Sequence, residues 1–126
     1  MLKVKTRYFQ NHDERGTIEG LINIGTWREI NKISSVAGSI RGKHYHKKTQ
    51  ELFIILDGRI KIFLEKIENN IVISTDCVEV RAGDVFIIAP YIQHTFTIIT
   101  DAVWLNALSE PFDQRDPDIF RGSHEA

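Results

Sequence analysis

Polar and apolar residues alternate along much of the chain, and this pattern predicts β-strands almost throughout. Residues 59–66 alternate in the way expected of a half-buried strand. The apolar runs at residues 52–56 and 85–89 also indicate strands, since they are short and rich in isoleucine, valine and phenylalanine. We expect further strands at residues 17–27, 30–36, 71–74, 77–80, 94–100 and 103–108. The pattern therefore predicts an almost entirely β protein.

Turn-forming residues separate these runs roughly every 8–12 residues. Asp57-Gly58 lies between two apolar runs and predicts a β-hairpin, because both turn residues must tolerate a positive φ. Further turns are expected at residues 68–70 and 82–84, whereas residues 111–126 show no strand period and are expected to lie across the surface. Short strands with regular turns favour a closed barrel or a sandwich.

The size and charge of the chain narrow the class of protein. A length of 126 residues allows one hydrophobic core, so we expect a single domain over residues 1–126. The formal net charge of −1 gives no reason to expect binding to nucleic acid or to an anionic membrane. The chain has no apolar run of roughly 18 residues and no apolar leader, which predicts a cytoplasmic protein. A lone cysteine, Cys77, excludes an internal disulfide.

Three histidines and one glutamate carry most of the candidate chemistry. His44 and His46 are two positions apart in an expected strand, so both side chains should point to the same face. Glu51 follows near the start of the next strand, and His94 begins a later one. In a closed barrel these side chains can meet at one interior point. Such a set is a plausible group of ligands for zinc, iron, manganese or nickel.

The spacing of these residues resembles the two sequence motifs of the cupin superfamily. Residues 38–58 match the first motif, G-x5-H-x-H-x4-E-x6-G, at every position. Residues 83–94 keep the glycine-to-histidine distance of the second motif, G-x5-P-x-G-x2-H-x3-N. The second stretch departs from its motif because the proline falls one place late at Pro90, Ile92 replaces the glycine and Ile98 replaces the asparagine. The resemblance implies an all-β, single-domain cupin (a jelly-roll barrel, or double-stranded β-helix) whose metal ligands are His44, His46, Glu51 and His94.

Two arginine-glycine pairs resemble signatures of the RmlC-like nucleotide-sugar 3,5-epimerases of deoxysugar synthesis. Residues 13–16 read D-E-R-G and residues 41–45 read R-G-K-H-Y, similar to the D-x-R-G and R-G-x-H-Y signatures of that family. There the arginines contact the nucleotide diphosphate, a task that suits the bidentate guanidinium group, and the histidine is the general base. The resemblance implies that Arg15, Arg41 and the neighbouring Lys43 bind substrate and that His44 is catalytic.

His46 departs from the epimerase pattern, because those enzymes have glutamine at this position and bind no metal. Residues 43–53 and 104–118 are similar instead to the C-terminal zinc cupin domain of bifunctional capsular-polysaccharide enzymes, which epimerises a 4-keto nucleotide sugar at C3. The dTDP-4-keto-6-deoxyglucose 3,4-ketoisomerases share R-G-x-H-x-H and the late proline. All three groups transfer a proton next to a ketone.

Together these resemblances imply an epimerase or isomerase of a dTDP- or UDP-linked 4-keto sugar in polysaccharide or deoxysugar synthesis. A divalent metal, first of all zinc, and a homodimer are expected. Two alternatives stay open: a metal-dependent enzyme of the dioxygenase type, and a cupin that binds metal or sugar without turnover. The role of His44 also stays open, because a histidine that binds a metal cannot easily act as the free base.

Overall fold

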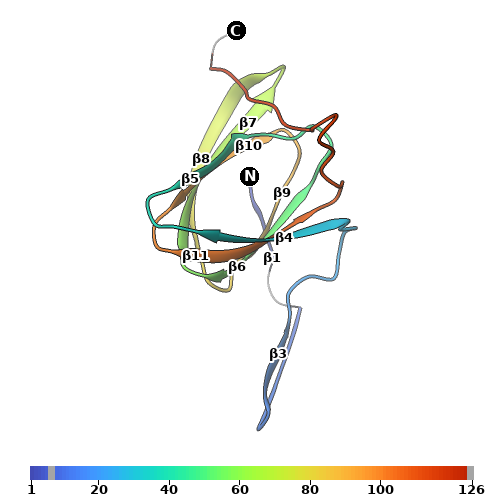
Figure 1. Ribbon diagram of the computed structural model, residues 1–126, viewed down its shortest axis with the longest axis vertical. Coiled ribbons are helices and arrows are strands. Elements are labelled where there is room, and N and C mark those ends of the chain that lie inside the picture. Colours follow the sequence, from blue (N-terminus) through green and yellow to red (C-terminus); the bar gives the residue numbers. More distant parts are fainter. Residues whose placement is uncertain (6–7, 125–126) are drawn as a thin grey trace.

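The computed structural model describes residues 1–5 and 8–124, and these residues form β-strands and loops without any helix. In that part of the chain there is accordingly no helix that is long and apolar enough to cross a membrane. The strands build two larger antiparallel sheets that face each other, and a separate hairpin extends away from them (Figure 1). The expected all-β barrel is confirmed.

The five-stranded sheet has the order β1 (Lys3–Lys5), β9 (Val85–Ile88), β6 (Glu51–Asp57), β11 (Ala102–Leu108) and β4 (Glu29–Ser35). The four-stranded sheet has the order β5 (Ile40–His44), β10 (Ile92–Ile98), β7 (Arg59–Glu68) and β8 (Ile71–Arg81). The separate hairpin consists of β2 (Phe9–Asp13) and β3 (Gly16–Gly20). Most strand positions follow the sequence pattern, but residues 71–74 and 77–80 form one continuous strand, β8.

The hydrophobic core lies between the two larger sheets. Phe53 of β6 stacks on Trp104 of β11 with ring centroids 5.6 Å apart, and Phe96 of β10 meets the same indole at 4.8 Å from the facing sheet. Ile62 and Leu64 of β7 are fully buried against this cluster. The alternation of residues 59–66 thus reflects one face in the core and one in solvent, as expected for a half-buried strand.

The predicted hairpin at Asp57-Gly58 is wrong. β6 ends at Asp57 in the five-stranded sheet, and β7 begins at Arg59 in the four-stranded sheet, so the two strands do not pair. Gly58 has a φ of 94°, and a Cβ there would lie 2.8 Å from the Cα atom of Ala102. Glycine therefore permits a tight corner between the sheets. The Asn69–Asn70 turn, by contrast, joins the paired strands β7 and β8, with φ values of 52° and 62°.

The strand expected at residues 17–27 ends early, at Gly20 of β3. Residues 21–27 instead supply Leu21, Ile22 and Trp27, which pack against the outer face of the five-stranded sheet. This second cluster includes Leu52, Val85, Ile87 and Ala107. These strands are therefore apolar on both faces because one face covers the core and the other is covered by the chain itself.

Candidate functional site

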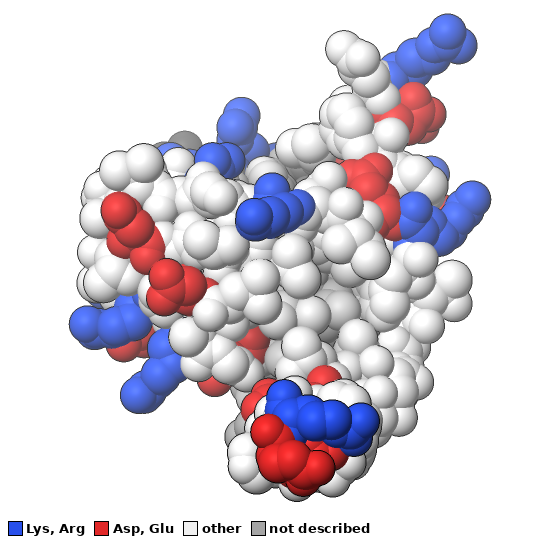
Figure 2. All heavy atoms as spheres, turned by 60° about the horizontal axis from the view of Figure 1, so that its bottom comes forward, with Lys and Arg blue, Asp and Glu red and all other residues white. Residues whose placement is uncertain are grey.

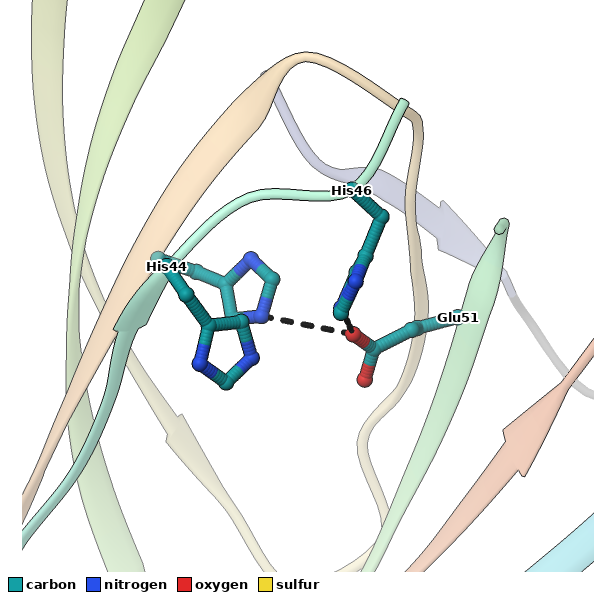
Figure 3. A group of neighbouring side chains, drawn as sticks. His44, His46 and Glu51 are labelled. Carbon is teal, nitrogen blue, oxygen red and sulfur yellow. Dashed lines mark hydrogen bonds and ion pairs between the residues drawn. The ribbon is translucent and has the colours of Figure 1, made fainter. Parts of the chain in front are cut away.

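The structure brings the four candidate metal ligands together inside one end of the barrel. One ligand atom from each of His44, His46, Glu51 and His94 lies within 4.8 Å of the others. Figure 3 shows the imidazoles of His44 and His46 and the carboxylate of Glu51 directed toward a common centre. His94 and Glu51 are buried, and the other two residues are half-buried.

Different parts of the fold position these four side chains. His44, the last residue of β5, pairs directly with His94 of β10, and opposite residues of antiparallel strands present their side chains on one face. Glu51 begins β6 in the facing sheet. His46 lies in the loop between β5 and β6, not in a strand as the His-x-His spacing had suggested. Its ring therefore depends on contacts other than a sheet ladder.

Backbone carbonyl groups orient two of the histidine rings. Nδ1 of His94 lies 3.0 Å from the carbonyl oxygen of Ile92, and Nδ1 of His46 contacts the carbonyl oxygen of Asp118. A carbonyl oxygen only accepts hydrogen bonds, so we assign the Nδ1–H tautomer to both rings. This tautomer leaves Nε2 with a free lone pair, as a metal ligand requires.

The glutamate is oriented by a residue that sequence reasoning missed. Nδ2 of Asn106 donates to Oε2 of Glu51 at 2.8 Å, and this leaves Oε1 facing His46 and His94. Asn106 lies two positions beyond buried Trp104 on β11 and is itself buried. A polar residue at an inward-facing position of an apolar strand is the signal that could have identified it.

Electrostatic contacts within the cluster define its charge. Burial alone would raise the pKa of Glu51, but its interactions with His46 and His94 lower that pKa well below its usual range. Burial opposes protonation of His46, but the contacts with Glu51 and Asp118 and their negative charges together outweigh burial and raise the pKa of the ring. Burial and the neighbouring histidines lower the pKa of His44 to about 4, so its ring is neutral near pH 7. His44 also has no hydrogen bond to either ring nitrogen among the described residues.

The donor set fits a divalent transition metal. Nε2 of His94 is buried, lies 3.4 Å from Oε1 of Glu51 and makes no hydrogen bond in the described part of the chain. A buried ring nitrogen without a partner is costly, and coordination of a cation would satisfy it. Imidazole nitrogens and one carboxylate match the preferences of zinc and iron.

Of the candidate substrate residues, Arg41 and Lys43 are exposed residues of β5, the strand that ends at His44. Arg41 pairs with Phe96, whose ring is in the core, so both side chains lie on the inner face of the sheet. Its Nε donates to Oγ of Ser35 at 3.0 Å, and the same hydroxyl accepts a hydrogen bond from the Trp104 indole. Lys43 is exposed, and its carbonyl oxygen accepts a hydrogen bond from Arg121.

Arg15 is not brought to this cluster within one chain. It lies in the turn between β2 and β3, where its guanidinium pairs with Asp13 at 2.7 Å and its side chain is 83% exposed. The hairpin projects from the barrel on the side opposite the C-terminal segment (Figure 1). Figure 2, with this side turned forward, shows basic and acidic side chains together at the end of the projection.

The loop before His94 keeps the backbone conformation of the second motif without its glycine. Tyr91 has a φ of 65°, whereas Ile92 is a buried residue of β10, so the assignment of the glycine position to Ile92 was wrong by one residue. The amide of Tyr91 donates to the carbonyl oxygen of His46 at 2.7 Å. This loop therefore supports the backbone of one candidate ligand and leads directly into another.

A cavity of about 320 Å³ lies beside His46, between residues 46–49 and the segment 108–120. Its walls combine two lysines with acidic and apolar side chains: Lys47, Lys48, Leu108, Glu110, Pro111, Phe112, Asp113, Asp116, Asp118, Ile119 and Phe120. The segment after β11, expected to lie across the surface, thus forms a wall next to the ligand cluster.

A comparison with known protein families shows the family to which the chain belongs. Residues 11–120 match the family described as the polysaccharide biosynthesis C-terminal domain. The chain belongs to this family. None of the curated proteins compared with it matches the chain.

Solved structures share the fold of this family member, the cupin jelly roll. The 3,4-ketoisomerase QdtA from Thermoanaerobacterium thermosaccharolyticum, in complex with TDP, is 21% identical with a TM-score of 0.73, over 96% of this chain and 88% of its own. A dTDP sugar isomerase from Desulfovibrio desulfuricans is 16% identical with a TM-score of 0.78, over 99% and 85%. CapF, a capsular polysaccharide assembling protein from Staphylococcus aureus, is 22% identical with a TM-score of 0.68; the match covers 90% of this chain but only 33% of CapF.

Proposed function

We propose that this polysaccharide biosynthesis C-terminal domain is a metal-dependent epimerase or isomerase of a 4-keto nucleotide sugar. The observation that carries the proposal is the buried cluster of three histidines and one glutamate, with Arg41 on the same inner face of the four-stranded sheet. The similarity in fold to QdtA, which was solved with TDP, supports a nucleotide-linked substrate. A dTDP- or UDP-linked sugar, with its diphosphate bound by Arg41 and Lys43, is the substrate class that we propose.

We propose that His46, Glu51 and His94 hold the metal, zinc in the first instance, because a hydrogen bond from outside the cluster orients each of them. A bound divalent cation would supply positive charge that stabilises the oxygen anion formed when the carbon next to the ketone loses its proton. His44, whose ring is neutral near pH 7 and has no hydrogen-bond partner among the described residues, accepts that proton on a ring nitrogen and returns it. This division of roles resolves the conflict between ligand and base.

Exchange of the sugar C3 proton with deuterium oxide tests this mechanism, with a dTDP-4-keto-6-deoxy sugar as the probe. We expect exchange and bound zinc in the wild type, loss of both in Glu51→Gln, and loss of exchange with zinc retained in His44→Ala. Zinc loss in His44→Ala would instead make His44 a ligand. An enzyme of the dioxygenase type would require iron and show no exchange, and a binding protein would take up zinc and nucleotide without exchange.

We also propose that the protein is a homodimer in which the β2–β3 hairpin packs against the second subunit. An isolated two-stranded hairpin is only marginally stable in water. On this hairpin the side chains of Phe9 and Ile18 are 45% and 64% exposed. A second copy would cover these apolar side chains and could receive Arg15 at its own substrate site. Arg15 can then bind nucleotide only across the dimer.

A further inference from the structure

We propose that Asp118, in the C-terminal segment, is a positioning residue that holds His46 in the orientation required for metal binding. This inference rests on the proposed metal-binding function. It adds to the site a residue that lies in an irregular segment, 72 positions from the histidine on which it acts.

The Asp118 carboxylate is held by the loop that follows His46. Oδ1 accepts a hydrogen bond from the amide of Lys47 at 2.8 Å. Oδ2 accepts hydrogen bonds from the amides of Lys48 and Thr49, each at 2.8 Å, and from the Thr49 hydroxyl at 3.0 Å. Three successive amides that converge on one carboxylate form a concave anion site, here filled by the protein's own side chain. The carboxylate therefore fixes residue 118 and the loop relative to each other.

The same residue contacts the metal-binding side chain directly. The carbonyl oxygen of Asp118 accepts the hydrogen bond from Nδ1 of His46. Carboxylate and carbonyl belong to one residue, so fixing the first restricts the position of the second. The contact orients the His46 ring with Nε2 toward Glu51. Such contacts from outside the ligand set orient metal-binding histidines and increase their basicity.

His46 needs this support more than the other ligands do. His94 is in β10 and Glu51 is in β6, where strand pairing restrains the backbone, whereas His46 is in a loop. The C-terminal segment also holds the residue on the other side of His46. Tyr45 and Phe120 exchange backbone hydrogen bonds of 2.8 and 3.0 Å, so the loop is attached to this segment both before and after the histidine. The Phe120 ring further lies 4.1 Å from Nζ of Lys47.

Zinc affinity of the full-length protein, measured by competition with a chromophoric chelator, tests the proposal. We expect Asp118→Ala to weaken zinc binding by about 10- to 100-fold, the range typical for loss of a partner that orients a ligand. Asp118→Asn keeps the size of the side chain and one acceptor oxygen, so we expect a smaller loss. Asp116→Ala is the matched control, because Asp116 lies in the same segment and makes no side-chain hydrogen bond among the described residues. Its affinity should equal that of the wild type.

The cobalt(II) absorption spectrum separates positioning from a general loss of stability. At saturating cobalt we expect the bands of both Asp118 variants to differ from those of the wild type and of Asp116→Ala, because a released His46 changes the geometry at the ion. Wild-type affinity and an unchanged spectrum in Asp118→Ala would overturn the proposal while Glu51→Gln still lost zinc. If wild type and Glu51→Gln bound zinc equally weakly, the proposed metal function itself would fail, and this inference with it.

Discussion

The C-terminal segment and the β2–β3 hairpin both lie outside the two larger sheets, yet they are attached in opposite ways. The segment forms isolated bridges from Phe120 to Tyr45 and from Ser123 to Ile71, and its Gly122 amide donates to the Gln93 side chain at 2.8 Å. Among the described residues, the strands of the hairpin pair only with each other. The C-terminal segment is anchored beside the ligand cluster, whereas the β2–β3 hairpin projects toward solvent.

This difference shows that strand periodicity and integration into the fold are separate properties. Residues 111–124 lack a strand pattern, yet Asp118 contacts a candidate ligand directly. Residues 9–20 form regular paired strands, yet all of them except Gly20 keep at least part of their surface in solvent. We infer that the segment acts within its own subunit and the hairpin on a second subunit.

Mixing two inactive variants tests the role of the hairpin with the largest expected effect. We expect Arg15→Gln and His44→Ala to be inactive alone, and a co-expressed mixture to regain activity. A mixed dimer contains one site with His44 from one chain and Arg15 from the other. The measurement is turnover of the purified mixture, with co-expressed Arg41→Gln and His44→Ala as the control. That pair should stay inactive, because Arg41 and His44 belong to one strand and act together. Absence of recovery in the first mixture would place Arg15 outside the site.

Removal of each segment in turn tests the comparison directly. A chain that ends at Ser109 lacks Asp118 and Phe120, so we expect its zinc affinity to fall about 100-fold or more. A chain in which a short glycine-serine linker replaces residues 9–20 should keep its zinc affinity but lose its dimeric state and, with Arg15, its turnover. Titration calorimetry and sedimentation velocity measure the zinc affinity and the dimeric state. An equal loss of zinc affinity in both deletion variants would contradict the different roles that we assign to the C-terminal segment and the hairpin.

Phe120→Ala should give an intermediate effect, since this half-buried ring contacts Tyr45 at 5.7 Å between centroids. We expect the free energy of unfolding to fall by about 1–2 kcal/mol, less than for a fully buried phenylalanine. Phe112→Ala, at a position that is 56% exposed, is the matched control and should cost less. Urea titrations followed by circular dichroism measure both. A larger cost at Phe112 would mean that the segment is anchored elsewhere.

The smallest effect is expected at the hairpin tip. Asp13→Asn removes the ion pair with Arg15, but the pair lies at an exposed turn, where solvent screens the attraction. We therefore expect no measurable change in melting temperature by scanning calorimetry. A clear decrease would show that the tip is packed, which would favour a dimer with Asp13 at its interface.

Local patterns located the strands more reliably than the sheets to which they belong. Asp57-Gly58 and Asn69-Asn70 both look like hairpin turns in the sequence, yet the first is a corner between sheets and the second joins paired strands. Both kinds of turn need residues that tolerate a positive φ, so the turn residues cannot distinguish them. The distinction depends on which strand edges are available when the chain packs.

The sequence by itself determined the positions of most strands and the four residues of the candidate metal cluster. Strand alternation is a local property with a period of two, and the spacing of His44, His46, Glu51 and His94 can be read from one chain. Only the tertiary structure decided that His46 lies in a loop, that Arg15 projects away from the cluster, and that Asn106 and Asp118 orient two of the ligands. These features depend on contacts between residues far apart in the chain, which hydrophobic periodicity does not encode.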